Sequence, residues 1–494
     1  MVTTTIQEKQ QQVEQVINQN SNFSPINKNL LPEFCIKVST LDKVFTTIKE
    51  SIAKKVFHPI LNYVLVQVNK EDITFTTFDL STAIQLTVDD NIDVYKMGSV
   101  CLPYEIIAKT IKTIKTTVEA VNFTVIDNEA EGILYDINDV DKKFNLMVEC
   151  LSSEDYPSIE DTVEQSVIDI EMDSTILLKG LEAIKDSVST EDSKPYLQGI
   201  NLKPDLIDNP IYNGQSNGTG NIDSNNGTTN TNLLVPSNHI KLASTNASIL
   251  KFLYCEVVNH NYTTNDSVYP SIIIPTIGIK QIISAIDYYD TNTRGNISIK
   301  ANSAVLKATI GNTTVFTRLI DAMYPKYEQL IPTKDCSDTT IYAIDKEYLL
   351  KALNNISVTL DQANRIIRLT INRSYDILST INLNITTYSK QRLSKNTASS
   401  NMPISIISSS NKVQEMCDNQ QEQLWTVLLN IDLLESIIRS LPSDVVIVYV
   451  KDNILQPVIF NNGISIESSG NKEPSINDNV YDILTGFCMP VGDR

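Results

Sequence analysis

The sequence predicts an α+β protein that repeats one structural unit three times. Two short amphipathic patterns each occur three times in alternating order, the first at residues 42–52, 173–184 and 345–356 and the second at residues 102–114, 274–286 and 429–441. Runs of β-branched residues lie between these patterns. The length of 494 residues also suits three domains of about 150 residues each. Such repetition favours a symmetric object whose shape is its function.

The repeated patterns are expected to be helices. In the second pattern, matching apolar residues recur at steps of four and three, which puts one stripe on one helix face. These residues are Ile107, Ile111 and Ile114, then Ile279, Ile283 and Ile286, and then Leu434, Ile438 and Leu441. The first pattern follows Asp42, Asp173 and Asp345. We expect these three to be N-caps, because a carboxylate accepts hydrogen bonds from the free N–H groups of a first helical turn.

Strands are expected between the helices, where alternating or β-branched runs indicate one buried face. The runs are residues 61–68, 73–78, 83–88, 122–126, 296–301, 305–310, 366–371 and 445–450. Tight polar turns between such runs favour antiparallel sheets over parallel ones.

The domain boundaries are expected near two Tyr-Pro pairs, at Pro157 and Pro325, because proline after a strand stops ladder pairing. We predict a flexible polar extension over residues 1–32 and three units at residues 33–160, 161–334 and 335–494. Two polar insertions lack core-forming residues and are expected to be mobile at the surface. They are the Asn- and Gly-rich residues 204–235, predicted to be disordered, and the Ser-, Asn- and Gln-rich residues 389–423.

Composition excludes several classes of protein. No apolar run approaches the roughly 20 residues of a membrane helix, and the N-terminus lacks the apolar core of a signal peptide. The seven cysteines are scattered, without a CxxC pair, which suits a reducing cytosol rather than a disulfide framework or a zinc site. These observations predict a cytoplasmic protein that has no contact with a membrane.

The charge is strongly acidic on average but unevenly distributed. A net charge of −19 by itself argues against nucleic acid, whose backbone attracts Lys and Arg. Lysines nevertheless gather on the repeated helices, while the segments between them carry much of the acid. The lysines could simply form a solvated helix face. Alternatively, six helices of one polarity line a common surface.

No catalytic constellation stands out. His58, His239 and His260 show no metal-ligand spacing, and the Gly-rich loops and nucleophile elbows of common enzymes are missing from the sequence. The acidic pairs Asp89/Asp90 and Glu154/Asp155 could hold Mg²⁺, but adjacent loop carboxylates are usually just solvated. We therefore predict a protein that is not an enzyme and that binds no cofactor or metal.

Seven short segments, in order, are similar to motifs of the bacterial sliding clamp, the β subunit of DNA polymerase III. They are Phe57-His-Pro-Ile-Leu-Asn62, Thr76-Thr-Phe-Asp-Leu80, Gly98-Ser-Val-Cys-Leu-Pro103, Ser152-Ser-Glu-Asp-Tyr-Pro157, Lys194-Pro-Tyr-Leu-Gln-Gly199, Leu319-Ile-Asp-Ala-Met-Tyr-Pro-Lys-Tyr327 and Cys488-Met-Pro-Val491. The resemblance covers nearly the whole chain from about Phe34 onwards.

The resemblance implies the DNA-clamp fold: three repeated domains with antiparallel sheets outside and two helices per domain inside, closed into a ring by a head-to-tail homodimer. It implies a processivity factor that encircles double-stranded DNA and tethers the replicative polymerase during DNA replication. The DNA contact would be independent of base sequence. The expected DNA-binding residues are Lys43, Lys49, Lys54, Lys55, Lys109, Lys112, Lys179, Lys185, Lys194, Tyr196, Lys280, Lys346, Lys351 and Arg439.

The resemblance also implies a pocket for short apolar peptides of the polymerase and the clamp loader. Its expected residues are Leu197, Ile249, Pro325, Gln329, Leu330, Leu455, Met489, Pro490 and Val491. Three departures from the family pattern affect this pocket. Gln329 replaces a basic residue, residues 243–249 lose the Gly, His and Arg of the rim, and the C-terminal Val491-Gly-Asp-Arg494 differs from the usual ending.

These departures leave an alternative open. A divergent paralogue of the clamp would keep the fold and act as an interaction scaffold or regulator with altered polymerase docking. A third and weaker hypothesis is an enzyme hidden in the β-rich scaffold.

Overall fold

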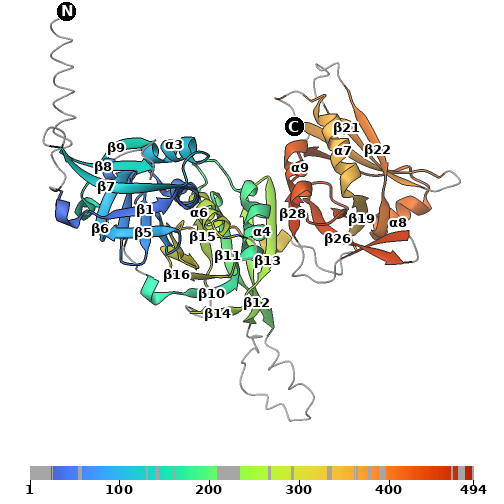
Figure 1. Cartoon of the computed structure of the whole chain (residues 1–494). Helices are drawn as coiled ribbons and strands as arrows, with labels where there is room; N and C mark the ends of the chain where they lie inside the picture. Colours follow the sequence, from blue (N-terminus) through green and yellow to red (C-terminus); the bar gives the residue numbers. More distant parts are fainter. Residues whose placement is uncertain are drawn as a thin grey trace, which may run out of the picture. The chain divides into compact units, whose positions relative to one another are not determined.

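The structure is a computed structural model that describes residues 24, 26–53, 58–128, 132–139, 144–159, 163–208, 234–264, 269–290, 294–330, 337–360, 362, 365–375, 380–388, 397–468, 471–476 and 484–491. The chain divides into two compact units. Figure 1 shows the helices and strands of the whole chain. Unit 1 comprises Met1–Asp169 and Ile277–Arg318, and unit 2 comprises Ile170–Thr276 and Leu319–Arg494. The division of the sequence into three repeats stays a prediction. Most of the insertion at 204–235 lies outside the described residues.

Unit 1 contains two antiparallel sheets and three of the repeated helices. One sheet has the order β5–β1–β7–β8–β9, with β1 (Glu33–Lys37), β5 (Ile92–Lys96), β7 (Ala120–Asn128), β8 (Gly132–Asp139) and β9 (Asn145–Glu149). The other has the order β16–β17–β18–β4–β3–β2–β6, with β2 (Tyr63–Val68), β3 (Ile73–Phe78), β4 (Thr82–Val88), β6 (Gly98–Pro103), β16 (Asn296–Ala301), β17 (Val305–Ile310) and β18 (Thr313–Arg318). The helices are α2 (Val38–Thr47), α3 (Tyr104–Ile114) and α6 (Thr276–Asp287), which enters unit 1 at its second residue.

Unit 2 also contains two large antiparallel sheets. One has the order β15–β11–β12–β13–β28–β26–β25–β19–β23, with β27 added beside β26. Its strands are β11 (Gly199–Asp208), β12 (Leu234–Thr245), β13 (Ile249–Glu256), β15 (Ile272–Pro275), β19 (Thr339–Asp345), β23 (Ser405–Ser408), β25 (Val445–Lys451), β26 (Val458–Ser468), β27 (Asn471–Ile476) and β28 (Thr485–Cys488). The other has the order β22–β21–β20–β24, with β20 (Ile366–Arg373), β21 (Ile381–Thr387), β22 (Ser399–Pro403) and β24 (Gln423–Asn430).

Four helices accompany these sheets, and two further strands complete the set of elements. The helices are α4 (Ser174–Ile184), α7 (Lys346–Ser357), α8 (Asn411–Asp418) and α9 (Ile431–Ser440), and the strands are β10 (Ile168–Asp173) and β14 (Asn259–Tyr262). All eight predicted strand segments coincide with strands of the structure, namely β2, β3, β4, β7, β16, β17, β20 and β25. The α+β class is confirmed.

The predicted apolar stripes face the core. All the matching residues of α3 and α9 are buried, as are Ile279 and Ile286 on α6. On α6, however, Ile282 takes the fully buried place and the predicted Ile283 is only half buried. Both residues lie near the face that carries Ile279, because residues three and four positions apart are neighbours on a helix.

Two of the three predicted N-caps are confirmed. Asp173 accepts hydrogen bonds from the backbone N–H groups of Thr175 and Ile176, at 2.7 and 3.0 Å, and Asp345 accepts one from Tyr348. Both carboxylates satisfy donors that a first helical turn leaves free.

The third predicted cap is wrong. Helix α2 begins at Val38, so Asp42 lies within it, and Lys37 holds the cap position without a side-chain hydrogen bond. Counted from Lys37, the first pattern aligns without a gap, and its buried residues Leu41, Phe45 and Ile48 match Leu177, Leu181 and Ile184 of α4. An alignment that takes Asp42 as the cap is therefore out of register, because the buried face of the helix determines where α2 begins.

Asp173→Ala is expected to lower the free energy of unfolding of unit 2 by about 1 kcal/mol, because two N–H groups of α4 lose their acceptor. Chemical denaturation followed by far-UV circular dichroism measures this difference. Asp42→Ala is the matched control, because Asp42 caps no helix and loses only a surface ion pair with Lys115 at 3.4 Å, which should cost at most about 0.5 kcal/mol. Equal losses in the two variants would contradict the assignment of the caps.

The described part of the insertion at 389–423 is folded, which corrects the expectation of a mobile segment. Residues 397–423 include β22, β23 and α8, and Met402, Ile404 and Val413 are buried. β22 pairs with β21, and this ladder satisfies the backbone hydrogen-bonding groups of the segment, so it folds with few buried apolar side chains.

The end of the predicted N-terminal extension also belongs to the fold. Leu31 is buried, and Ser24 donates hydrogen bonds from its N–H and its hydroxyl to Asp155, both at 2.7 Å. Residues 1–23 lie outside the described residues.

Each unit contains one place where strands far apart in the sequence join into a continuous sheet. In unit 1, β4 pairs with β18, and Ala83 lies opposite Phe316. In unit 2, β13 pairs with β28, and Leu250 lies opposite Phe487. In both joints one strand follows a tight turn, and the other precedes a segment that leads to a Pro. We call these two contacts the internal joints.

Candidate functional site

Most of the predicted DNA-binding cations are at the surface. Lys43, Lys49, Lys109, Lys112, Lys179, Lys280, Lys351 and Arg439 are exposed, and Lys185, Lys194 and Tyr196 are partly buried. Seven of these exposed cations project from the repeated helices, whose opposite faces pack into the core; Lys49 follows α2 in a 3₁₀ turn. Lys54 and Lys55 lie outside the described residues.

Several of these cations are held by carboxylates. Lys109 pairs with Glu105 and Lys351 with Glu347, each at 2.6 Å, and Arg439 Nε bonds to Glu435 at 2.8 Å. Each pair joins residues one helical turn apart. Looser or non-helical pairs link Lys43 to Asp290 at 3.7 Å, Lys185 to Glu182 at 3.9 Å and Lys194 to Glu191 at 2.8 Å.

Four exposed lysines contrast with these pairs. In the described part of the chain, no carboxylate lies within 4.0 Å of Lys49, Lys112, Lys179 or Lys280. These four ammonium groups are free to meet an anionic ligand.

Lys346 has a structural role that the sequence did not reveal. It is partly buried, and its ammonium donates a hydrogen bond to the backbone carbonyl of Leu441, just after α9. Burial lowers the pKa of Lys346. Because the side chain ties α7 to the end of α9, we leave Lys346 out of the proposed DNA contact.

The six repeated helices are close to neutral. They contain eight cationic side chains and seven acidic ones, whereas the whole chain has a net charge of −19. The helices are thus much less acidic than the chain as a whole. Their attraction for a phosphate backbone is nevertheless modest, since that attraction grows with the number of free cations.

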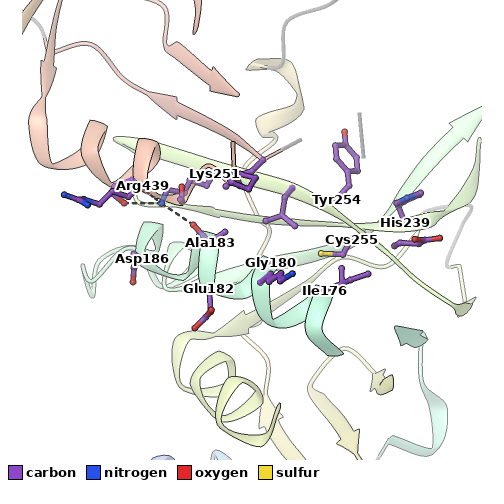
Figure 2. A pocket seen from close by; sticks show the side chains of 17 residues that line it. Ile176, Gly180, Glu182, Ala183, Asp186, His239, Lys251, Tyr254, Cys255 and Arg439 are labelled. Carbon is purple, nitrogen blue, oxygen red and sulfur yellow. Dashed lines mark hydrogen bonds between the residues drawn. The ribbon is translucent and has the colours of Figure 1, made fainter. Parts of the chain in front are cut away.

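A cavity of about 1070 Å³ in unit 2 brings two of the predicted cations together (Figure 2). Lys179 on α4 and Arg439 on α9 both line it. The acids Glu182, Asp186 and Glu256 also line it, and they equal in number the three lining cations Lys179, Lys251 and Arg439.

Lys251, on β13, lies in the lining of this cavity and is the residue that the sequence analysis missed. Its side chain is buried, with 1% of the residue exposed. Its ammonium donates hydrogen bonds to the carbonyl of Ala183 at 3.3 Å, to the carbonyl of Ser436 at 3.0 Å and to the hydroxyl of Ser436 at 3.1 Å (Figure 2).

These bonds make Lys251 a connection between α4 and α9. Ala183 lies in the last turn of α4, where carbonyls lack helical partners and the helix dipole attracts a cation. Burial lowers the pKa of Lys251 to about 8, although Asp186 acts in the opposite direction. The sequence held one signal, a single lysine inside the apolar run Ile249-Leu-Lys-Phe-Leu253.

The predicted peptide-pocket residues divide into a buried and an exposed group. Leu197 and Ile249 are buried, and Pro490 and Val491 are partly buried. Pro325, Gln329, Leu330, Leu455 and Met489 are exposed.

The structure brings two parts of this set together. Ile249 lies opposite Cys488 in the joint between β13 and β28, and the N–H of Met489 donates to the carbonyl of Ser248 at 3.0 Å. The C-terminal residues 489–491 therefore continue directly from the edge of the joint.

An aromatic cluster supports the segment that carries Pro325. Tyr327 is buried against Phe252 and Phe487, with ring centroids 5.8 Å apart for the pair Tyr327 and Phe252. Tyr324 packs against the same cluster. Met323, which was not predicted, is 93% exposed beside these anchored rings. An exposed methionine next to a rigid aromatic base is typical of a surface that binds apolar partners.

The acidic pairs considered for Mg²⁺ are used in other ways. Asp155 accepts the two hydrogen bonds from Ser24, and Asp89 accepts one from the side chain of Asn312 at 3.1 Å. Among the described residues, no group of three His, Cys, Asp or Glu side chains is arranged to hold a metal ion. The described helices also include none that is both long and apolar enough to cross a membrane.

Comparison with known proteins gives one family and one fold. Residues 32–160 match the model of the DNA polymerase III beta subunit, N-terminal domain. The Beta sliding clamp of Synechocystis sp. is 22% identical over 346 residues, which are 67% of this chain and 76% of that protein. The Beta sliding clamp of Haemophilus influenzae is 23% identical over 319 residues, which are 63% of this chain and 70% of that protein.

Solved structures match over a larger part of the chain. The DNA polymerase sliding clamp of Bacillus subtilis superposes with a TM-score of 0.68 at 14% identity, covering 94% of this chain and 100% of the other. The DNA polymerase III beta subunit of Thermotoga maritima gives a TM-score of 0.66 at 14% identity, with coverage of 94% and 100%. The fold is therefore that of the sliding clamps.

Proposed function

We propose that this chain is a divergent member of the bacterial sliding-clamp family, and that it encircles duplex DNA and tethers the replicative DNA polymerase during DNA replication. The observation that carries the proposal is the set of amphipathic helices, which bury one face and present cations on the other. In this role the protein catalyses no reaction. It holds an enzyme on its template in the cytoplasm.

The charge of the helices fits a contact that slides. Free lysines attract phosphates without reading bases, so the contact does not depend on sequence. The nearly neutral helices make that attraction weak, while the acidic remainder of the chain repels DNA from other surfaces. Lasting attachment must then come from topology, because a closed ring leaves DNA only when it opens or reaches an end.

We further propose that the ring is a head-to-tail homodimer closed by a third joint of the same kind as the internal joints. In the described sheets, β9 of unit 1 and β22 of unit 2 each lie at the end of a sheet. β9 precedes the Tyr156-Pro157 segment, as β18 precedes Tyr324-Pro325. Both strands have five residues, enough for a ladder as long as the internal ones.

The alternation of hydrogen-bonded residues along β9 supports this pairing. The N–H of Asp139 donates to the carbonyl of Phe144 at 3.3 Å. Because antiparallel pairs alternate between bonded and non-bonded, Leu146 and Val148 bond to β8, and Asn145 and Met147 point their N–H and C=O groups to the open side.

The residues of β22 alternate in the same way. The N–H of Thr387 donates to the carbonyl of Ala398 at 3.1 Å, so Ser399 and Asn401 point their backbone groups away from β21. Ser399 is the first residue of β22 whose backbone groups point to the open side. Ala83 of β4 and Leu250 of β13 are likewise the first outward-pointing residues of their strands in the internal joints.

A backbone contact near the Pro segment supports a proposed partner for Ser399. The backbone N–H of Leu151 donates to the carbonyl of Cys101, and the N–H of Ile320 donates to the carbonyl of Ile273 in the same way. Four residues before Ile320 lies Phe316, which pairs with Ala83 in an internal joint. The corresponding residue, four before Leu151, is Met147. We therefore propose that Met147 of one copy pairs with Ser399 of the next, and Asn145 with Asn401.

For partners, we propose that the exposed apolar residues of the predicted peptide pocket receive short apolar peptides of the polymerase and the clamp loader. Leu455 is 70% exposed and Met489 is 40% exposed, so both side chains are available to a ligand. Gln329 offers no positive charge, and we expect a weaker preference for acidic peptide ends than in a pocket with a basic residue there.

A threading experiment tests the proposed function. The protein is mixed with a surface-bound linear duplex, so that rings thread over the free end, and that end is then capped with streptavidin. After a wash in molar salt, we expect the protein to stay on capped duplexes and to leave uncapped ones, because salt screens the charges but does not break a topological link.

The outcome against the proposal is equal retention with and without the cap, or no retention on either duplex. Either result would favour the alternative role, in which the protein acts as a scaffold or a regulator.

A further inference from the structure

Three glutamates of the repeated helices hold cations that would otherwise meet DNA. The pairs are Glu105–Lys109 on α3, Glu347–Lys351 on α7 and Glu435–Arg439 on α9, and we call them the acid–cation pairs. In every pair the glutamate lies four residues before the cation, the order in which the two side chains reach each other best.

The first two pairs lie at the surface. The side chains of Glu105 and Lys109 are 78% and 75% exposed, and those of Glu347 and Lys351 are 78% and 66% exposed. The pKa of Glu105 and that of Glu347 are lowered, chiefly by the hydrogen bond from the lysine, so both carboxylates stay charged at neutral pH. An approaching phosphate thus meets one positive and one negative group at each pair.

Stability alone does not explain these pairs. Exposed ion pairs one turn apart contribute little to folding, because both charges remain hydrated. Their effect on an anionic ligand is larger, since each pair removes one cation from the set available to phosphates and adds one repelling charge. Lys112, Lys179 and Lys280 show that these helices also carry unmasked lysines.

We propose that Glu105, Glu347 and Glu435 limit the affinity of the clamp for DNA, so that the ring stays mobile on the duplex. This inference rests on the proposed function. Removing the three carboxylates would convert three neutral pairs into three free cations while the fold and the apolar faces stay as they are.

The test compares E105Q/E347Q/E435Q with a control variant, E71Q/E154Q/E415Q. The control makes the same change in net charge at exposed glutamates outside the six repeated helices. Binding to a short linear duplex is measured by fluorescence anisotropy over a range of salt concentrations. The helix variant is expected to bind roughly tenfold or more tightly at low salt, with a salt dependence steeper by about 0.9 in log–log slope for each pair released. The control should stay near the wild type.

Equal binding by the two variants would overturn the inference. That failure is distinguishable from a failure of the proposed function, because the capped-duplex experiment uses the wild-type protein alone. A wild type retained on capped DNA, with no difference between the two variants, rejects only the role of the glutamates. Conversely, a wild type lost from capped DNA rejects the ring whichever variant binds more tightly.

Discussion

Met147→Pro is expected to convert the proposed dimer into a monomer at micromolar concentration. Met147 points its N–H to the open side of β9, where the third joint would form, and proline has no N–H to donate. A closed dimer contains two copies of the joint, so each substitution acts twice. Losing one hydrogen bond of about 1–1.5 kcal/mol at each joint raises the dissociation constant roughly 100-fold.

Sedimentation velocity over a concentration series measures this change. Met147→Thr is the matched control, because it removes the same exposed apolar side chain and keeps the N–H, and it should stay dimeric. The fold should survive in both variants, since Leu146 and Val148 make the hydrogen bonds to β8. A dimer that tolerates Pro at position 147 would exclude β9 from the interface. A wild-type protein that is monomeric at these concentrations would contradict the proposed ring.

Lys251→Ala is expected to lower the free energy of unfolding of unit 2 by about 2–4 kcal/mol. The change removes three buried methylene groups and the ammonium and leaves a void, which usually costs this much for a large side chain. It also leaves the carbonyl of Ala183 without the ammonium that bonds to it, and a buried acceptor without a partner adds to the loss. Denaturant unfolding monitored by fluorescence measures the difference.

Lys251→Met separates the volume from the charge. Methionine fills most of the space and avoids the cost of burying an ammonium, so this variant should recover to within about 1.5 kcal/mol of the wild type at pH 7. If the alanine and methionine variants lost the same stability, the charge rather than the packing would dominate.

The buried ammonium also predicts a pH dependence of stability. The pKa of Lys251 is about 8 in the folded protein and lies near its ordinary value of 10.5 in the unfolded chain. Between these values the unfolded state binds more protons, so the stability of the wild type relative to Lys251→Met should rise with pH. The gain starts near pH 8 and is complete near pH 10.5, reaching on the order of 3 kcal/mol. A flat difference over this window would mean that the ammonium is not desolvated.

Much of the fold was predictable from local pattern. The β-branched runs became strands, and the repeated apolar steps became helices that bury those residues, because both periodicities follow directly from backbone geometry. Where the prediction failed, local signals competed. Asp42 offered a plausible cap, but the helix begins at Val38, five residues before the start that a cap at Asp42 predicts. The polar segment after residue 396 has a weak pattern of its own and folds because β21 supplies a partner.

The candidate site was predictable only as a list of charged and apolar residues. The sequence placed Lys109, Lys280 and Lys346 in one class, yet the first is held by Glu105, the second is free and the third bonds to the end of α9. Lys251 was missed because its acceptors lie 68 and 185 residues away in the chain.

The α+β class, the repeated helices and the resemblance to the sliding clamps could be predicted from the sequence, since these depend on the order and spacing of residues along the chain. Only the tertiary structure decided which cations are free, which lysine connects α4 to α9 and which strand edges stay open. The reason is physical: the charge state of a surface and the pairing of an edge depend on groups that folding brings near from distant positions, and spacing along the chain carries no record of them.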